Sequence, residues 1–237
     1  MSGSGLKTQA AMTPQALRVP LERGTSTTAL IYAASQPPRA ALVLAPGAGA
    51  NQRSVFMVEF ATALAGLGLD VITFNFSYME AGRRMPDRRP VLETCYRAVV
   101  ELVADQLGPR RLFVGGKSMG GRIATQMAAA DPDRPIAGLV LLGYPLHPPG
   151  RPESRRDAHL PSVRRPMLFV QGSRDSFGTP QELAPVLDGL SPRPTLHVVE
   201  GGDHSFKLSR RDGAAQAAAC EQVQRTIIEW VAGVDAR

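Results

Sequence analysis

The sequence is poor in cysteine and has no long apolar run. Its 237 residues include only two cysteines, Cys95 and Cys220, and both fall on the apolar faces of helical patterns. We therefore expect buried thiols rather than a disulfide bond or a cysteine nucleophile. No apolar run approaches the ~18 residues that would span a bilayer, and the first residues lack the apolar core of a signal peptide. These absences predict a cytoplasmic protein without a membrane partner.

Lysine is also scarce, because it occurs only at Lys7, Lys117 and Lys207. Arginine supplies most of the 27 basic residues, which stand against 21 acidic ones and give a net charge of +6 and a pI near 9.9. Such a pI is typical of nucleic-acid-binding proteins, but here the arginines are scattered over several loops without interleaved aromatic residues. We therefore predict no nucleic-acid partner. The wealth of Ala, Arg and Pro favours a bacterial, GC-rich coding bias.

The length suits one large α/β domain. Residues 1–15 are small and polar and are expected to form a disordered tail, and residues 16–237 a single domain. After an opening hairpin at 17–21 and 27–33, apolar strands alternate with helical patterns. Strands are expected at 40–45, 71–74, 111–114, 136–142, 167–171 and 195–199, and helices at 55–67, 90–107, 180–190 and about 214–231. This alternation predicts a mainly parallel sheet covered by helices on both faces.

One short motif stands between a predicted strand and a predicted helix. Gly116-Lys-Ser-Met-Gly120 has the form G-x-S-x-G, follows the apolar run that begins at Arg111 and precedes an Ala-rich helical pattern that ends near Asp131. In a nucleophile elbow the chain turns so tightly that glycine is favoured two residues before and after the serine. The context therefore identifies Ser118 as a candidate nucleophile.

Two nucleotide-binding motifs are incomplete in this sequence. Gly116-Lys117-Ser118 would end a phosphate-binding loop only if position 111 were glycine, and that position is Arg111. Gly47-Ala-Gly49 begins a G-x-G-x-x-G pattern, but Gln52 stands where the third glycine belongs. Without these glycines the backbone lacks the close approach to phosphate that both motifs require, so we predict no nucleotide cofactor.

An acid and a histidine follow the next strands along the chain. Asp175 comes after the strand at 167–171, and His204 comes after the strand at 195–199. The carboxyl ends of parallel strands meet at one edge of the sheet, where ligands bind. The order serine, acid, histidine is that of the hydrolase elbow, so Ser118, Asp175 and His204 are the predicted triad. Asp203 and Glu200 are alternative acids, although Asp203 is too close to His204 in sequence to orient its ring easily.

This triad would support acyl transfer. His204 would accept the proton of Ser118 as the serine attacks a carbonyl, and Asp175 would orient the imidazole. The oxyanion needs two backbone donors, which we assign to the N–H of Met119 and to that of Ala48, with the N–H of Gly47 as the second choice for the latter. Ala48 and Gly47 lie in the loop Pro46-Gly-Ala-Gly-Ala50 that follows the strand at 40–45.

Four segments together resemble a known family. They are Leu44-Ala-Pro-Gly-Ala-Gly-Ala50, Gly115-Gly-Lys-Ser-Met-Gly-Gly-Arg122, Gly143-Tyr-Pro-Leu-His-Pro-Pro-Gly150 and Gly201-Gly-Asp-His-Ser-Phe206. They are similar to the branch of the α/β hydrolases that is related to dienelactone hydrolases and includes bacterial hydrolase-like proteins and a eukaryotic chromatin-complex subunit. The resemblance covers about residues 25–232 and implies the α/β-hydrolase fold with the same triad. Ser118 replaces the cysteine of dienelactone hydrolases, and Pro46 replaces the histidine of the common His-Gly oxyanion motif.

Polar residues at the expected rim suggest a substrate class. Two loops are rich in arginine and could hold a carboxylate or phosphate by bidentate pairing, or could be solvated or paired internally. The candidate substrate-binding residues are Gly47, Tyr78, Arg83, Arg84, Lys117, Tyr144 and His147, and the same loops carry Arg88, Arg89, Arg151, Arg155, Arg156, Arg164 and Arg165. The short excursion at 144–166 predicts a minimal cap and a shallow, open pocket.

The sequence thus predicts a serine hydrolase of the carboxylesterase type that uses neither metal nor cofactor. Its partner would be a small ester or thioester, and this substrate would be anionic if the arginine-rich loops hold a carboxylate or phosphate. A hydrolase-fold scaffold that binds a partner or an acyl ligand without turnover is the alternative, since a fold does not guarantee activity. Oligomeric state is left open.

Overall fold

The computed structural model describes residues 13–35, 40–108, 110–209 and 212–234. Its centre is one eight-stranded sheet with the order β1-β2-β4-β3-β5-β6-β7-β8. The strands are β1 (Gln15–Pro20), β2 (Ser26–Tyr32), β3 (Ala40–Ala45), β4 (Asp70–Phe74), β5 (Arg111–Lys117), β6 (Gly138–Leu142), β7 (Met167–Gly172) and β8 (Thr195–Val199). The pairs β1/β2 and β2/β4 are antiparallel, and every pair from β4 to β8 is parallel.

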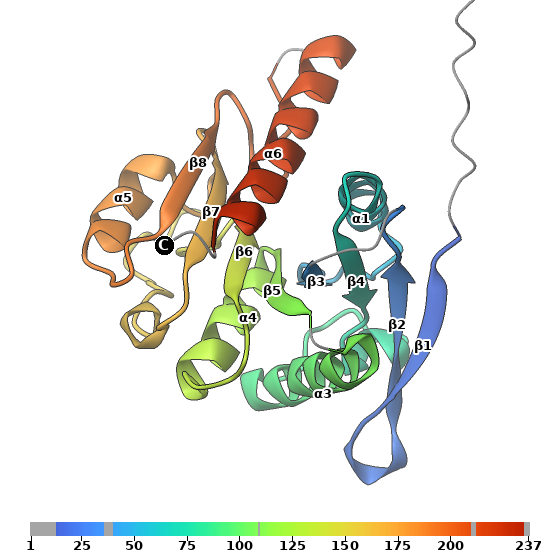
Figure 1. Ribbon diagram of the computed structural model, residues 1–237. Helices are drawn as coiled ribbons and strands as arrows, with labels where there is room; N and C mark the ends of the chain where they lie inside the picture. Colours follow the sequence, from blue (N-terminus) through green and yellow to red (C-terminus); the bar gives the residue numbers. More distant parts are fainter. Residues whose placement is uncertain (1–12, 36–39, 109, 210–211, 235–237) are drawn as a thin grey trace, which may run out of the picture.

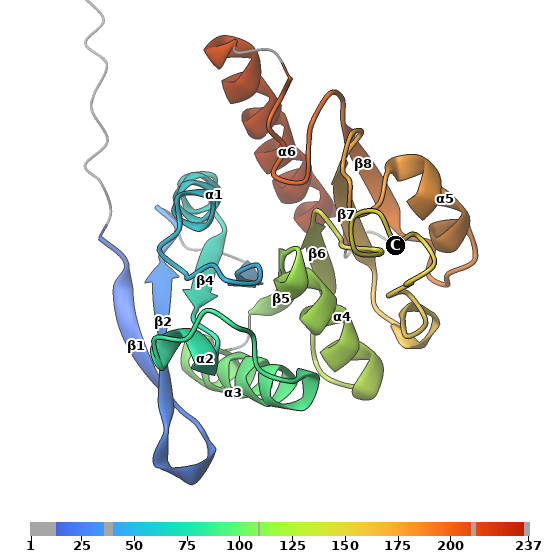
Figure 2. The ribbon, with the colours of Figure 1, turned by 180° about the vertical axis from the view of Figure 1, so that it is seen from behind.

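Helices cover both faces of this sheet, as Figure 1 and Figure 2 show from opposite sides. The helices are α1 (Val55–Gly66), α2 (Ser77–Glu80), α3 (Arg89–Leu107), α4 (Met119–Ala130), α5 (Pro180–Asp188) and α6 (Gly213–Gly233). One core cluster joins the sheet to α3, α4 and α5, and a second joins its other face to α1 and α6. Strands β3, β4, β6 and β7 are buried along their whole length, and β5 is buried from Leu112 onward, which explains why their sequences are largely apolar rather than alternating.

The predicted fold class is confirmed, and most element boundaries agree within a few residues. Strand β5 is longer than expected because it continues through the two glycines to Lys117. The short helix α2 was not predicted; it forms where the chain turns after β4. The predicted tail, residues 1–15, lies mostly outside the described residues, and β1 already begins at Gln15.

The connection from β6 to β7 is short and holds one 3-10 turn, η2 (Leu160–Ser162). Leu146, Leu160 and Val163 of this connection are buried in the core cluster of α3, α4 and α5, so the segment packs against the domain as a minimal cap. Both cysteines are free: Cys95 is buried, whereas Cys220 is partly exposed on α6.

Candidate active site

Ser118 stands at the turn between β5 and α4 with a backbone conformation that L-residues rarely adopt. Its φ is 52° and its ψ is −117°, and its N–H donates to the carbonyl oxygen of Leu142 on β6 at 2.9 Å. Such a conformation costs on the order of 1–3 kcal/mol and persists only where the surroundings impose it. Here the adjacent strand and the helix start impose it.

The glycines on either side of Ser118 are required by close backbone packing. A Cβ on Gly116 would lie 2.6 Å from the carbonyl oxygen of Ala45, and one on Gly120 would lie 2.7 Å from that of Pro46. Both distances are shorter than real Cβ contacts. The G-x-S-x-G pattern therefore has its two glycines because the elbow packs closely against the end of β3.

Three side chains from different strand ends form one hydrogen-bonded chain. The Nε2 of His204 lies 2.8 Å from the Oγ of Ser118. The Nδ1 of the same ring lies 3.0 and 2.8 Å from the two carboxylate oxygens of Asp175. Because a carboxylate accepts and does not donate, Nδ1 carries the proton and Nε2 faces the serine hydroxyl as an acceptor.

Asp175 is completely buried, and neighbouring groups satisfy its carboxylate. The Nε2 of Gln171 donates to its Oδ2 at 2.8 Å, and the N–H of Phe177 donates to its Oδ1 at 2.8 Å. The Phe177 ring also stacks on the His204 ring, with centroids 4.2 Å apart. These contacts fix the orientation of both the acid and the imidazole.

The alternative acid Asp203 has another place. Its Oδ1 accepts the N–H groups of Ser205 and Lys207 at 2.8 and 2.9 Å. Asp203 thereby shapes the turn that carries His204, while Asp175 lies beside the imidazole.

Lys117 is buried beneath this arrangement, with 8 % of its surface exposed. Its Nζ donates to the carbonyl oxygen of His204 at 2.6 Å and lies 5.7 Å from the centre of the Phe56 ring. Burial lowers the pKa of Lys117 from 10.5 to about 8, although Asp175 and Asp203 act in the opposite direction. The lysine next to the serine therefore anchors the loop of the histidine.

The loop after β3 lies against the elbow. A Cβ on Gly47 would be 3.7 Å from the Cβ of Ser118, so the two backbones are close neighbours. The N–H of Gly49 donates to the hydroxyl of Tyr78 at 3.1 Å. Tyr78 is fully buried on α2, so this hydrogen bond fixes the loop on its core-facing side.

A cavity of about 630 Å³ opens above Ser118 and His204. Gly47, Ala48, Lys117 and Met119 of the predicted site also line it. The remaining lining residues are Ala50, Ser54, Phe56, Met57, Pro86, Asp87, Arg89, Leu92, Arg122, Ile123, Pro145, Arg156, Phe177 and Ser205.

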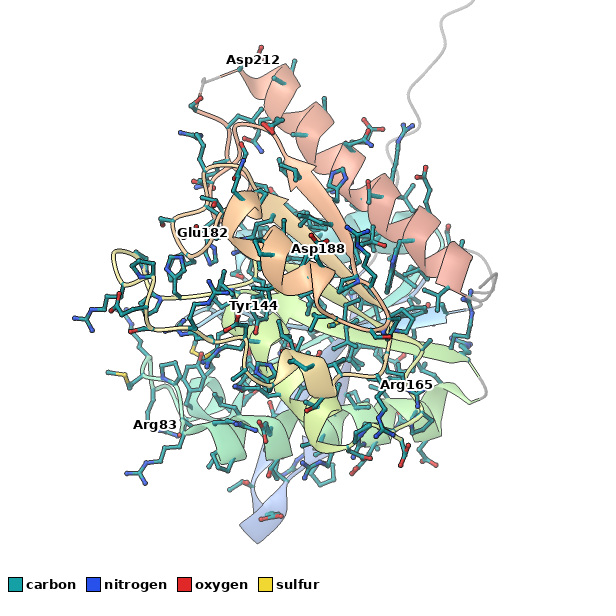
Figure 3. The ribbon with its side chains drawn as sticks, turned by 90° about the vertical axis from the view of Figure 1, so that its left-hand side faces the viewer. Arg83, Tyr144, Arg165, Glu182, Asp188 and Asp212 are labelled. Carbon is teal, nitrogen blue, oxygen red and sulfur yellow. The ribbon has the colours of Figure 1, made fainter. Side chains whose placement is uncertain are left out.

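Other predicted substrate-binding residues lie outside this lining. Arg83 forms an ion pair with Asp87 at 2.8 Å and extends away from the body of the protein (Figure 3). Arg84 is exposed and also does not line the cavity. Tyr144 is buried in the core, where its hydroxyl donates to the carbonyl oxygen of Arg156 at 2.7 Å. His147 is buried next to Glu182, with Nε2 3.2 Å from Oε1.

Several residues that shape the site had not been assigned a role in it. Gln171 and Phe177 flank Asp175 in sequence, and Arg122 stands four residues after Ser118 on α4. A helix residue at this spacing lies one turn above the serine and on the same side; this spacing was the available signal for Arg122. Within the described residues, no group of three or more His, Cys, Asp or Glu could hold a metal ion, and no helix is long and apolar enough to cross a membrane.

The sheet order, the serine on its strained turn and the acid and histidine after later strands define the α/β-hydrolase class of fold. The chain belongs to the α/β-hydrolase domain family, whose profile matches residues 38–232. The predicted superfamily is thus confirmed, whereas the relation to a chromatin-complex subunit stays a prediction.

Two curated relatives come from Mycobacterium tuberculosis. An uncharacterised protein is 29 % identical over 175 residues, which are 68 % of this chain and 61 % of that protein. A putative phosphoribosyl transferase is 28 % identical over 201 residues, or 82 % of this chain and 41 % of that protein. This chain therefore spans only about three fifths and two fifths of the length of these relatives.

Solved structures share the fold at low sequence identity. An α/β serine hydrolase without a lid from Xanthomonas campestris superposes with a TM-score of 0.72 and 22 % identity, over 92 % of this chain and 95 % of that one. A dienelactone hydrolase from Anabaena variabilis gives 0.70 and 17 % over 92 % and 99 %. A thermostable carboxyl esterase from Bacillus coagulans gives 0.72 and 14 % over 94 % and 99 %.

Proposed function

We propose that this protein is a serine hydrolase that cleaves a small carboxylic ester or thioester through an acyl-enzyme. The observation that carries the proposal is the hydrogen-bonded chain from Ser118 through His204 to the buried Asp175. Fold neighbours that are a serine hydrolase and a carboxyl esterase support the reaction class. The two curated relatives leave the substrate open.

In this reaction the Oγ of Ser118 attacks the carbonyl carbon while its proton passes to Nε2 of His204. The tetrahedral intermediate collapses, the alcohol or thiol leaves with the proton from His204, and the acyl group stays on the serine. Water then attacks the acyl-enzyme as His204 takes one of its protons, and the second tetrahedral intermediate collapses as His204 gives that proton to the Oγ of Ser118. Release of the carboxylic acid restores Ser118. Asp175 keeps Nδ1 protonated and stabilises the imidazolium, so that Nε2 always faces the serine.

The oxyanion would be held by backbone N–H groups of Met119 and Ala48. Met119 begins α4, where N–H groups are free of helical partners and the helix dipole favours negative charge. Ala48 lies on the loop that contacts Ser118. Each such donor contributes about a hundredfold or more to the rate in serine hydrolases. Tyr78 acts here through the hydrogen bond to Gly49 and not through the substrate.

The cavity size supports a small substrate. A volume of about 630 Å³ falls in the range of small-molecule sites, and its lining combines apolar side chains from α1, α3 and α4 with a few polar groups. The minimal cap leaves the site without a closing domain, which suits short or flexible acyl groups.

The test is active-site labelling with a fluorophosphonate, compared between the native protein, Ser118→Ala and Ser205→Ala. Ser205 is the matched control because it lines the same cavity. We expect one label on the native protein and on Ser205→Ala, and none on Ser118→Ala. Hydrolysis of short 4-nitrophenyl esters should show the same dependence.

Two results would decide against the proposal. A native protein that neither labels nor hydrolyses any short ester or thioester would leave the alternative, an acyl-ligand-binding scaffold. Labelling that persists in Ser118→Ala would mean that another residue is the nucleophile.

A further inference from the structure

Three arginines line the cavity above Ser118. Arg122 comes from α4, Arg89 from the start of α3, and Arg156 from the connection between β6 and β7. They are close enough to influence one another: burial lowers the pKa of Arg122, and Arg156 and Arg89 lower it further. Segments far apart in the sequence thus bring like charges to one wall of a single cavity, which costs energy unless a ligand offsets it.

Arg122 and Arg156 have no acidic partner among the described residues, in contrast to their neighbours. The Nε of Arg122 is buried and lacks a hydrogen-bond partner within the described part of the chain. Arg89 pairs with Glu93 at 2.5 Å, and Arg155, next to Arg156 in the chain, pairs with Asp157 at 2.7 Å. A buried N–H group without a partner loses its hydration without compensation.

The acidic residue in the cavity lining does not neutralise this pair. Asp87 lines the same cavity, but its Oδ1 is held by Arg83 at 2.8 Å. Arg89 pairs with Glu93 and Asp87 pairs with Arg83, so three basic residues of the lining, Lys117, Arg122 and Arg156, are without an ion pair among the described residues. The cavity therefore favours a negatively charged ligand.

The positive charge of the arginines also acts on a neighbouring histidine. His159 lies beside α4, with Nε2 2.8 Å from the Oγ1 of Thr125. Its pKa is lowered to about 4, first by burial and then by Arg89 and Arg122, against the effect of Asp157. His159 is thus neutral at physiological pH and leaves the arginines as the charged groups of this wall.

From this cluster we infer that Arg122 and Arg156 bind an oxyanionic group, a carboxylate or phosphate, on the substrate whose ester bond Ser118 attacks. The inference rests on the proposed function and assigns its substrate class, an ester or thioester with a second, anionic group. Guanidinium forks pair with such groups through two parallel hydrogen bonds.

The spacing of Ser118 and Arg122 limits the length of this substrate. The N–H of Arg122 donates to the carbonyl oxygen of Ser118 at 3.1 Å, and both residues line the same cavity of about 630 Å³. A cavity of this size holds a small molecule, so only a short chain can join the anionic group to the scissile carbonyl. Esters of short dicarboxylic acids meet this condition.

The first arm of the test compares charged and neutral esters of matched length. Acid release from monoethyl glutarate and from ethyl pentanoate is followed by pH-stat titration, and the ratio of their kcat/KM values is the readout. Ethyl 3-phosphonopropionate tests phosphate-like groups, and 3-acetoxypropanoate against propyl acetate tests an anion on the leaving group. We expect a ratio of about ten or more in favour of the anion in at least one pair. Arg122→Gln and Arg156→Gln should each lower that ratio about tenfold, whereas the exposed Arg84→Gln should keep it.

The second arm needs no turnover. In the Ser118→Ala background, monoethyl glutarate and the other anionic esters should raise the Tm because they bind only the folded protein, the neutral esters should not, and Arg122→Gln should abolish the rise. Arginine-dependent stabilisation in a protein that hydrolyses no ester would support the anion site while the proposed function fails. The anion site would be overturned, while the hydrolase stands, if kcat/KM were equal within every pair and the anionic esters did not raise the Tm. It would also be overturned if Arg84→Gln lost the preference for anionic esters as much as Arg122→Gln and Arg156→Gln do.

Discussion

The ammonium group of Lys117 donates a hydrogen bond of 2.6 Å to the carbonyl oxygen of His204. The residue before the proposed nucleophile thus holds the loop that carries the proposed base, 87 positions further along the chain. A short strand-to-helix turn and a long surface loop become one mechanical unit through this contact. Because the ammonium group is buried, the free energy of unfolding should depend on pH through Lys117.

Replacing Lys117 by Met should remove a pH dependence of stability. Below pH 8 the lysine is charged in both the folded and the unfolded protein, so the folded state bears the full cost of burying the charge. Because its folded pKa is about 8 and its ordinary value 10.5, the folded protein releases the proton first as pH rises. Its free energy of unfolding, relative to Lys117→Met, should therefore increase between those values, by on the order of 3 kcal/mol.

Urea unfolding at several pH values between about 7 and 10 checks this difference. Lys207→Met is the matched control, since Lys207 is an exposed lysine in the same loop. The wild type and Lys117→Met should diverge with pH, and the wild type and Lys207→Met should stay parallel. Parallel curves for all three proteins would contradict a buried, charged Lys117.

Replacing Gln171 should disturb the acid without touching the serine. Gln171 donates to Asp175 at 2.8 Å and to the carbonyl oxygen of Gly178 at 2.7 Å, and accepts the N–H of Tyr144 at 2.8 Å. In Gln171→Glu two carboxylates would lie side by side, and their mutual repulsion would keep one of them protonated up to a higher pH. When that group ionises, it adds a negative charge near His204, which favours the protonated imidazole. We expect the acidic limb of the kcat profile to move to higher pH.

The Gln171→Leu variant separates orientation from charge. It should lower kcat about tenfold or more at unchanged KM and reduce the free energy of unfolding by about 1–3 kcal/mol, because buried polar groups lose partners. Steady-state kinetics across pH on both variants provides the measurement. An unchanged profile for Gln171→Glu would mean that Gln171 only packs in the core.

The site residues that the sequence predicted are those that directly follow apolar strands. Ser118, Asp175 and His204 each follow an apolar run, and parallel strands bring those points to one edge, so the chain order implied their proximity. The arginines were different. Loop position placed Arg83 near the rim, but its guanidinium pairs with Asp87 and lies outside the cavity lining, at the edge of the molecule (Figure 3).

Partner assignment was the other step that sequence patterns did not supply. Gln171 lies near the end of an apolar strand and looks like any buried polar residue, and its hydrogen bonds depend on loops that meet only in the fold. Arg122 is one of many arginines in the sequence; its place in the cavity lining with a buried, unpartnered Nε among the described residues depends on tertiary packing.

Replacing Gly116 by Ala should damage both stability and activity. The added Cβ would lie 2.6 Å from the carbonyl oxygen of Ala45 and 2.7 Å from the backbone of Gly120, so the elbow must shift. Overpacking of this kind costs about 1–3 kcal/mol. Gly66→Ala is the control, since it lies in a helix with open space around it and should be neutral or slightly stabilising. Thermal unfolding and ester hydrolysis measure both effects; a Gly116→Ala protein as stable and active as Gly66→Ala would contradict the close packing.

Replacing Tyr96 by Phe should weaken the support of the site from below. The hydroxyl of Tyr96 accepts the N–H of Gly115 at 2.8 Å and lies 2.9 Å from the carbonyl oxygen of Val43 and 2.5 Å from that of Gly115. With its single proton it donates to one of these oxygens, so it joins β3 and β5 just before the proposed oxyanion loop and the elbow. Tyr96→Phe leaves a buried N–H of Gly115 without this partner, and we expect a loss of about 1–3 kcal/mol in the free energy of unfolding.

Because both strand ends position the proposed reacting groups, kcat of Tyr96→Phe for a short ester should fall together with stability. Urea unfolding with an unchanged m value, combined with steady-state kinetics, tests the coupling. A variant that loses stability but keeps the wild-type kcat would show that the tyrosine supports the sheet alone.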